Sequence, residues 1–296
     1  MELLILGTSS TKPTKKRSHS AYLLSYKNEG ILFDCGEGTQ RQLITAGIKA
    51  NKITRIMLSH WHGDHILGLP GLLQTLAVNE YTKSLHIYGP PGSEKRYKKM
   101  LEVFESSHKI EAKIHDINEE KFFETNDFYI ESYPLVHRIN CIGFRLVEKD
   151  KRQINMDKLK KLGLEEGPII GKIQEGEIIN FKGHRIKPEN VSKLIKGRIF
   201  SYIADTRPNK NCIKIAENAD VLLCESTYSS KDKDKAVKYK HLTAQEAAQI
   251  ASQANAKKLI LTHYSARYPD EHELEKDARN IFDNTFAAKD FAKYKI

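Results

Sequence analysis

The chain has 296 residues, of which 40% are hydrophobic and 29% charged, and its net charge is +10. This is ordinary globular composition, without internal repeats or low-complexity segments. No apolar stretch approaches the roughly 20 residues that span a bilayer, which excludes a transmembrane helix and predicts no membrane partner. The positive charge favours polyanionic partners, although a high content of charged residues also occurs in thermophile proteins.

Strand and helix patterns alternate along the chain. Short apolar runs that end in polar or glycine-containing turns predict strands at 3–6, 22–24, 31–33, 53–58, 84–88, 128–130, 141–147, 199–204, 221–224 and 258–262. Helical periodicity predicts helices at 39–46, 67–79, 94–105, 243–255 and 271–291. Many strands with interspersed helices indicate an α/β fold of layered sheets, in a single domain over residues 1–296.

The segment 149–198 differs from the rest. It holds thirteen Lys and Arg against seven Asp and Glu, which accounts for +6 of the net charge. Its strand periodicity is poor, and Gly167-Pro168 is a turn signal in its middle. Because strand patterns flank it on both sides, we interpret it as an insertion into the domain. Two readings stay open: an exposed variable loop, or a basic arm that grips a phosphate backbone.

The most informative motif runs from Ser59 to His65, with the sequence SHWHGDH. His and Asp are costly to bury unpaired, and imidazole and carboxylate are good zinc ligands. His60 and His62 alternate on an extended segment, so both can reach one metal ion. Asp64 and His65 are adjacent where the chain turns into a helix, so they can reach a second ion. The alternative is a polar, solvated loop.

Further candidate ligands follow predicted strands. His137, Asp205 and His263 each come directly after an apolar run. Strand ends hold side chains rigidly, while the loops that follow leave room for a substrate. Asp205 is the natural bridging ligand, because one carboxylate can bind two ions. These residues together predict a two-metal site, for which zinc is the preferred ion.

His241 precedes the predicted helix 243–255 and is not needed to complete either metal site. A histidine outside the metal ligands can donate a proton near neutral pH. The alternative is a surface histidine at a helix start.

The four cysteines, Cys35, Cys141, Cys212 and Cys224, lack CxxC spacing, which predicts reduced thiols and a cytoplasmic protein.

These motifs resemble the metallo-β-lactamase superfamily and, within it, the ribonuclease Z family of tRNA 3′-processing endonucleases. The SHWHGDH motif is shared by many hydrolases of the superfamily, so it indicates the fold more than the substrate. Narrower blocks are similar to ribonuclease Z over nearly the whole chain: LFDCGEGTQRQL at 32–43, HILGLPGLL at 65–73, ADTRP at 204–208 and THYSARY at 262–268.

The resemblance implies an αββα sandwich with an inserted, flexible basic arm. It implies that His60, His62 and His137 bind one Zn²⁺, that Asp64, His65 and His263 bind a second, and that Asp205 bridges the two. Asp64 would also orient or deprotonate the nucleophile, and His241 would protonate the leaving 3′-oxygen. The implied reaction cuts precursor tRNA after the discriminator nucleotide, leaving a 3′-OH on the tRNA and a 5′-phosphate on the trailer.

The resemblance also implies residues that contact the substrate. The segment 149–198 is similar to the family's arm, an exosite that clamps the tRNA elbow, with contacts from Gly167, Pro168 and Lys172. The loop at 13–18 is similar to the P-x-K-x-R-N loop that senses the tRNA 3′ end, with contacts from Pro13, Lys15 and Arg17. Ser18 stands where the pattern has Asn, so the treatment of mature CCA ends is open.

Two more expectations come from the family. Glu225 fits a buried acid that supports the site, although Cys224 beside it stands where the family has His. Family members are usually homodimers.

Two rival functions remain: another phosphodiesterase or small-ester hydrolase of the superfamily, or an RNA-binding protein without catalysis. Only an enzyme acting on a polyanion should lose activity steeply with salt.

Overall fold

The computed structural model describes residues 1–103, 110–117, 120–164 and 167–296. The chain divides into two compact units. The main unit comprises residues 1–123, 130–146 and 199–296, and the inserted unit comprises 124–129 and 147–198. Among the described residues, no helix is both long and apolar enough to cross a membrane.

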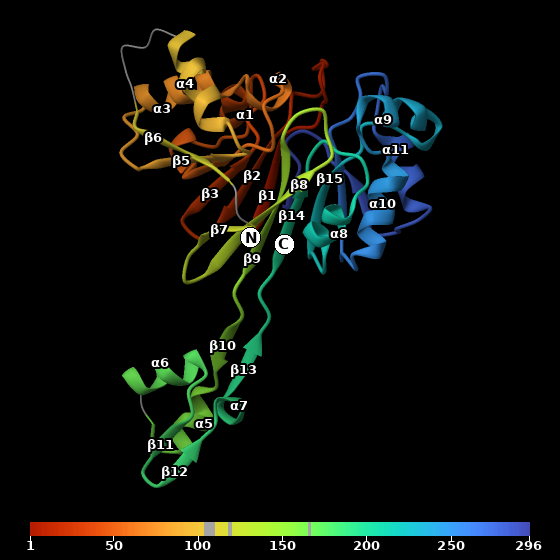
Figure 1. The fold of residues 1–296 in the computed structure, drawn as a ribbon. Coiled ribbons are helices and arrows are strands. Elements are labelled where there is room, and N and C mark those ends of the chain that lie inside the picture. Colours follow the sequence, from red (N-terminus) through yellow and green to blue (C-terminus); the bar gives the residue numbers. More distant parts are fainter. Residues whose placement is uncertain (104–109, 118–119, 165–166) are drawn as a thin grey trace. The chain divides into compact units, whose positions relative to one another are not determined.

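Two seven-stranded sheets form the frame of the fold (Figure 1). The first sheet has the order β18 (Lys293–Lys295), β1 (Glu2–Gly7), β2 (Ala21–Tyr26), β3 (Glu29–Phe33), β4 (Arg55–Met57), β5 (Leu85–Gly89) and β6 (Ala112–Asp116). Strands β18 to β3 pair antiparallel, and β3 to β6 pair parallel.

The second sheet has the order β17 (Thr285–Ala287), β16 (Leu259–Thr262), β15 (Val221–Glu225), β14 (Ile199–Ile203), β9 (Cys141–Glu148), β8 (Phe128–Leu135) and β7 (Lys121–Glu124). Strands β14 to β17 pair parallel. The carboxyl ends of these parallel strands therefore share one edge of the sheet, and the loops that follow them meet there.

Helices cover the outer face of each sheet. Helices α1 (Thr39–Thr45), α3 (Leu69–Val78) and α4 (Ser93–Val103) pack on the first sheet through one apolar cluster, which includes Leu23, Leu43 and Leu72. Helices α8 (Lys210–Ala216), α10 (Ala244–Gln253) and α11 (His272–Arg279) pack on the second sheet. The short helices α2 (Gly63–Ile66) and α9 (Lys233–Tyr239) and the 3-10 turns η1 (Ala50–Lys52) and η2 (Ser230–Asp232) lie in connections.

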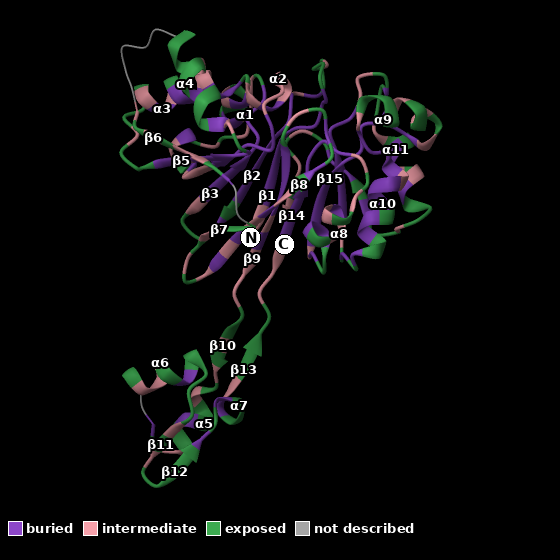
Figure 2. Ribbon diagram, viewed as in Figure 1, coloured by how far each residue is buried: buried purple, intermediate pink, exposed green. Residues whose placement is uncertain are grey.

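Aromatic side chains join the inner faces of the two sheets. The ring of Phe33 on β3 lies 5.7 Å from that of Phe144 on β9 and 5.2 Å from that of Phe200 on β14, and Tyr22 lies 5.2 Å from Tyr202. These sheets are therefore buried on both faces, as Figure 2 shows for the central strands, and their sequences are continuous apolar runs. The predicted αββα sandwich is confirmed.

The predicted helix at 271–291 is wrong in its second half. Helix α11 ends at Arg279, and residues 285–287 form strand β17, which pairs with Leu259–Leu261. The intervening 280–284 contains two Asn and one Asp, which favour turns over helix. The edge of β16 offers hydrogen-bond partners that a helix would leave unused. For the helix predicted at 94–105, residues 104 and 105 lie outside the described residues.

The inserted unit has more secondary structure than its sequence pattern suggests. Strands β10 (Lys151–Ile154) and β13 (Ser192–Ile195) form one ribbon, and β11 (Ile179–Phe181) and β12 (His184–Ile186) form another. Helices α5 (Met156–Lys161), α6 (Pro168–Glu175) and α7 (Pro188–Val191) complete it. It has its own apolar core, formed by Leu159, Leu164, Ile173, Ile186 and Val191. Short two-stranded ribbons bury little of either face, so apolar alternation is weak in their sequences.

Candidate metal centre

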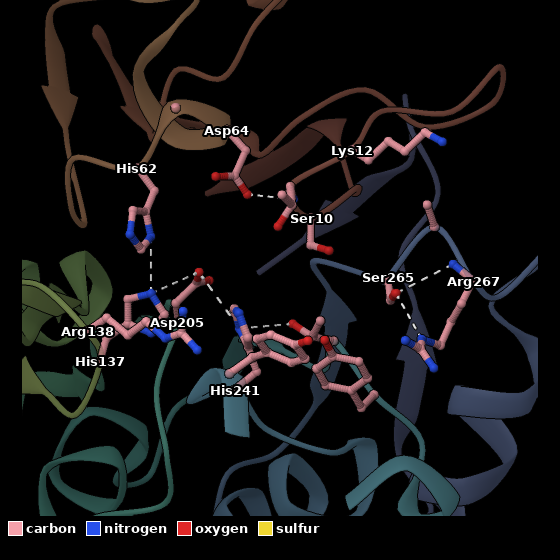
Figure 3. Close-up of a pocket in the computed structure, with 16 residues that line it drawn as sticks. Ser10, Lys12, His62, Asp64, His137, Arg138, Asp205, His241, Ser265 and Arg267 are labelled. Atoms are coloured by element: carbon pink, nitrogen blue, oxygen red, sulfur yellow. Dashed lines mark hydrogen bonds and ion pairs between the residues drawn. The ribbon is translucent and has the colours of Figure 1, made fainter. Parts of the chain in front are cut away.

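The predicted ligands converge at one end of the main unit. His60 and His62 follow β4, Asp64 and His65 lie in α2, and the other three follow strands of the second sheet: His137 after β8, Asp205 after β14 and His263 after β16. Beside them opens a cavity of about 660 Å³, whose lining includes His62, Asp64, His137, Asp205 and His241 (Figure 3).

The donor atoms form two groups around Asp205. In the first, His62 Nδ1 lies 3.0 Å from His60 Nε2 and 3.1 Å from His137 Nε2. In the second, which includes Asp64, His65 Nε2 lies 3.2 Å from His263 Nε2. Asp205 Oδ2 is 3.6 Å from His60 Nε2, and its Oδ1 is 3.3 Å from His263 Nε2. The carboxylate of Asp205 thus lies between the groups, where a bridging ligand is needed.

Asp34 determines which nitrogen of two imidazoles faces the cluster. Its buried carboxylate accepts hydrogen bonds from Ser59 N (2.7 Å), Ser59 Oγ (2.8 Å), Tyr202 OH (2.6 Å) and His65 Nδ1 (2.7 Å). Because the Ser59 hydroxyl donates to Asp34, its oxygen accepts from His60 Nδ1 at 3.0 Å. Both imidazoles therefore hold a proton on Nδ1, and their Nε2 atoms point into the cluster.

Two further imidazoles are oriented in the same way. His137 Nδ1 donates to the carbonyl oxygen of Lys240 at 3.0 Å. The Thr227 hydroxyl donates to Glu225 Oε2 at 2.6 Å, so it accepts from His263 Nδ1 at 2.9 Å. The Nε2 atoms of four histidines thus face one another at close range. Neutral imidazoles in this arrangement repel unless a cation lies among them.

The charge balance also fits a cation. Burial lowers the pKa of His60 well below its ordinary value, and it lowers the pKa of His62 and His137, so these imidazoles are neutral near pH 7. At His65 burial also opposes the charge, but Asp64, Asp34 and Asp205 outweigh it and raise the pKa to about 10. Asp205 Oδ1 is buried and has no hydrogen-bond partner among the described residues. Neutral nitrogens together with an unsatisfied buried carboxylate oxygen fit a divalent metal ion.

His241 lies beside the cluster and lines the cavity. Its Nδ1 is 3.2 Å from Glu225 Oε1 and 3.8 Å from Asp205 Oδ2. Glu225 is buried and also accepts from Thr206 N at 2.9 Å and from the Thr227 hydroxyl. Glu225, which the family resemblance implies as a buried acid that supports the site, thus lies in contact with His241.

A partly buried ion pair holds the backbone of His241. Arg207 pairs with Glu246 through two hydrogen bonds of 2.5 and 2.9 Å, and it also donates to the carbonyl oxygen of His241. Glu246 and Thr243 form the capping box that begins α10. The sequence did not predict that Arg207 orients His241, or that Asp34 orients His60 and His65. Both residues lie in the motifs that resemble the family, but the groups they contact are distant in sequence.

The predicted substrate residues lie in two places. The loop at 11–18 borders the cluster, because Thr11 N donates to Asp64 Oδ2 at 2.7 Å. Pro13 and Lys15 are exposed, whereas Arg17 is buried and donates to the carbonyl oxygen of Tyr268 at 2.6 Å, which fixes the loop. Gly167, Pro168 and Lys172 are exposed residues of the inserted unit, at the start of α6 and within it.

Replacing Asp34 by Asn should weaken metal binding. An amide cannot accept all four hydrogen bonds, so His60 and His65 lose their fixed tautomers. Loss of such a partner typically costs about 10–100-fold in metal affinity. Competition for Zn²⁺ against a chromophoric chelator measures this. The control is Tyr202→Phe, which removes one donor, keeps the carboxylate and should have a smaller effect. Unchanged affinity in folded Asp34→Asn contradicts the orienting role.

Comparison with known proteins agrees with this geometry. Residues 14–139 match the family model described as the metallo-beta-lactamase superfamily. A protein from Protochlamydia amoebophila named ribonuclease Z is 43% identical over 294 residues, covering 99% of this chain and 96% of its own length. One from Bacillus cereus, with the same name, is 39% identical over 305 residues and covers 100% of this chain and 99% of its own.

Solved structures give the same result. The crystal structure of human tRNase Z, short form, superposes with a TM-score of 0.74 at 28% sequence identity, covering 100% of this chain and 99% of that one. The similarity to the sequence relatives spans both units and the metal motif. The chain belongs to the ribonuclease Z family, within the metallo-β-lactamase superfamily.

Proposed function

We propose that the chain is a zinc-dependent endoribonuclease that removes the 3′ trailer from precursor tRNA. The cut falls after the discriminator nucleotide and leaves a 3′-OH on the tRNA and a 5′-phosphate on the trailer. The observation that carries this proposal is the cluster of inward-facing imidazoles and carboxylates beside an open cavity, in a chain that matches ribonuclease Z relatives over their full length.

In this proposal His60, His62 and His137 hold one Zn²⁺, Asp64, His65 and His263 hold a second, and Asp205 contacts both. The abundance of imidazole supports zinc over magnesium, which prefers oxygen ligands. When bound, the ions supply positive charge that stabilises a phosphorane and lowers the pKa of water toward about 7.

The chain's own residues would orient the reactants and move the protons. Asp64 orients and deprotonates the attacking water, and the backbone N–H of Thr11, 2.7 Å from its Oδ2, fixes this carboxylate. His241 gives a proton to the leaving 3′-oxygen. The carboxylate of Glu225, 3.2 Å from His241 Nδ1, stabilises the charged imidazolium that a proton donor requires.

Replacing Asp64 by Ala tests the catalytic assignment. Cleavage of a 3′-extended precursor tRNA should fall by at least about 100-fold, since both a ligand and a proton acceptor are lost. Gel analysis of the end-labelled RNA measures the rate. Asp283→Ala, at an exposed position outside the cavity lining, is the control and should cleave like wild type. Cleavage by Asp64→Ala at the wild-type rate would contradict the catalytic role of Asp64.

We propose the inserted unit as the tRNA exosite. Its cations near either end pair with acids: Lys149 with Glu124 at 2.6 Å, and Lys196 with Asp150 at 2.7 Å. Five of those between are exposed and pair with no carboxylate among the described residues: Lys160, Lys161, Lys172, Lys182 and Arg185. The central part of the unit therefore has positive charge available for phosphates.

Charge reversal separates binding from chemistry. The triple variant Lys160→Glu, Lys161→Glu and Lys172→Glu should raise KM for precursor tRNA, flatten its salt dependence and spare hydrolysis of a small phosphodiester. Lys196→Ala, which removes a cation already paired with Asp150, is the matched control and should change KM little. If the triple variant loses both activities together, the exposed lysines serve folding and the exosite proposal fails.

We also propose a cytoplasmic homodimer. All four cysteines are buried thiols without a disulfide, which suits a reducing compartment. The ribonuclease Z family, whose members are usually homodimers, supports the dimer.

A further inference from the structure

One wall of the cavity carries an exposed aromatic ring near two cations. Tyr239, the last residue of α9, is 38% exposed. Its ring centroid lies 5.4 Å from Arg138 Cζ and 5.5 Å from Lys238 Nζ. Tyr239 and Arg138 both line the cavity, and no described carboxylate forms a salt bridge with Arg138 or Lys238. This wall therefore offers an exposed ring, and beside it positive charge that no carboxylate of the described residues neutralises.

A second Arg–Tyr pair in the same cavity differs in the exposure of its ring and in the pairing of its cation. Tyr228 is only 7% exposed, and Arg267 Cζ lies 5.3 Å from its ring centroid. Arg267 also pairs with Asp232 at 3.2 Å. Its charge is thus partly neutralised and the ring beneath it is covered. Of these two pairs, the one at Tyr239 is the one open to a ligand.

Hydrogen bonds connect this wall to the backbone of the metal cluster. Arg138 Nη2 donates to the carbonyl oxygen of Lys238 at 3.0 Å, and His137 Nδ1 donates to that of Lys240. Lys240 Nζ donates back to the carbonyl oxygen of His137 at 3.3 Å. Figure 3 shows Arg138 next to His137, and His241 across from them beside Asp205. A ligand on Tyr239 would therefore sit at a fixed distance from both histidines.

We propose that Tyr239 and Arg138 form a subsite for the nucleotide on the 5′ side of the cut. Its base stacks on the Tyr239 ring, and its phosphate contacts Arg138. Stacking of bases on aromatic rings next to cations is a general mode of binding single-stranded nucleic acid. This inference rests on the proposed function: His241, two residues after Tyr239, serves the 3′-oxygen of the same nucleotide, so the wall lies on that side of the bond.

Kinetics of Tyr239 variants test the subsite. Tyr239→Ala should lower kcat/KM for precursor tRNA on the order of tenfold, whereas Tyr239→Phe keeps the ring and should stay near wild type. Hydrolysis of methyl 4-nitrophenyl phosphate, which has no nucleobase, should be unchanged in both. Phe286→Ala is the matched control, because Phe286 is also 38% exposed and lies 5.9 and 5.6 Å from Lys258 and Arg279, yet does not line the cavity.

Fluorescence identifies the stacked base. A precursor whose scissile 3′-oxygen is replaced by a methylene group carries 2-aminopurine either just 5′ of the cut or at the first trailer position. Wild-type enzyme should quench the 5′ label, and Tyr239→Ala should relieve that quenching. The trailer label should respond equally to both enzymes.

Three results overturn the subsite while leaving the proposed function intact: equal quenching of the 5′ label in Tyr239→Ala, relief at the trailer label instead, or a parallel loss of methyl 4-nitrophenyl phosphate hydrolysis. If wild-type enzyme does not cleave precursor tRNA at all, the proposed function fails first, and the subsite falls with it.

Discussion

The carboxylate of Asp34 is the interaction on which the site depends. It follows β3 of the first sheet, accepts from Tyr202 on β14 of the second, and binds both ends of the SHWHGDH motif through Ser59 and His65. A buried carboxylate is costly unless donors surround it, and here four hydrogen bonds do so. Because these donors come from both sheets, the packing of the sandwich and the orientation of the imidazoles are linked.

The same constraint explains why the cluster fits metal ions. Asp34, Lys240 and Thr227 accept hydrogen bonds from the Nδ1 atoms of His65, His137 and His263, so the Nε2 atoms of these histidines face one another inside the cluster. Asp205 adds a buried oxygen with no hydrogen-bond partner among the described residues. A fold that buries such groups together is stable when a cation joins them, so metal affinity and folding stability should be coupled.

Sequence patterns indicated the chemistry better than the details of the fold. His60, His62, Asp64 and His65 are neighbours in one motif, and strand-end positions singled out Asp205 and its companions, so the main site could be assembled without coordinates. The role of Arg207 could not be predicted from the sequence, because its partners lie on a helix and a loop more than 30 residues away. Strand β17 was hidden by a charged helical pattern, and the ribbons of the inserted unit by their weak alternation.

The central claim is that this cluster, loaded with metal, cuts precursor tRNA at one bond. The most direct measurement is cleavage of a 3′-extended precursor with mapping of both new ends, before chelation, after it and after adding back Zn²⁺. The account predicts one cut after the discriminator, with a 3′-OH and a 5′-phosphate, lost on chelation and restored by two zinc ions per chain. Cleavage that survives complete metal removal, or a 2′,3′-cyclic phosphate at the cut, would contradict it.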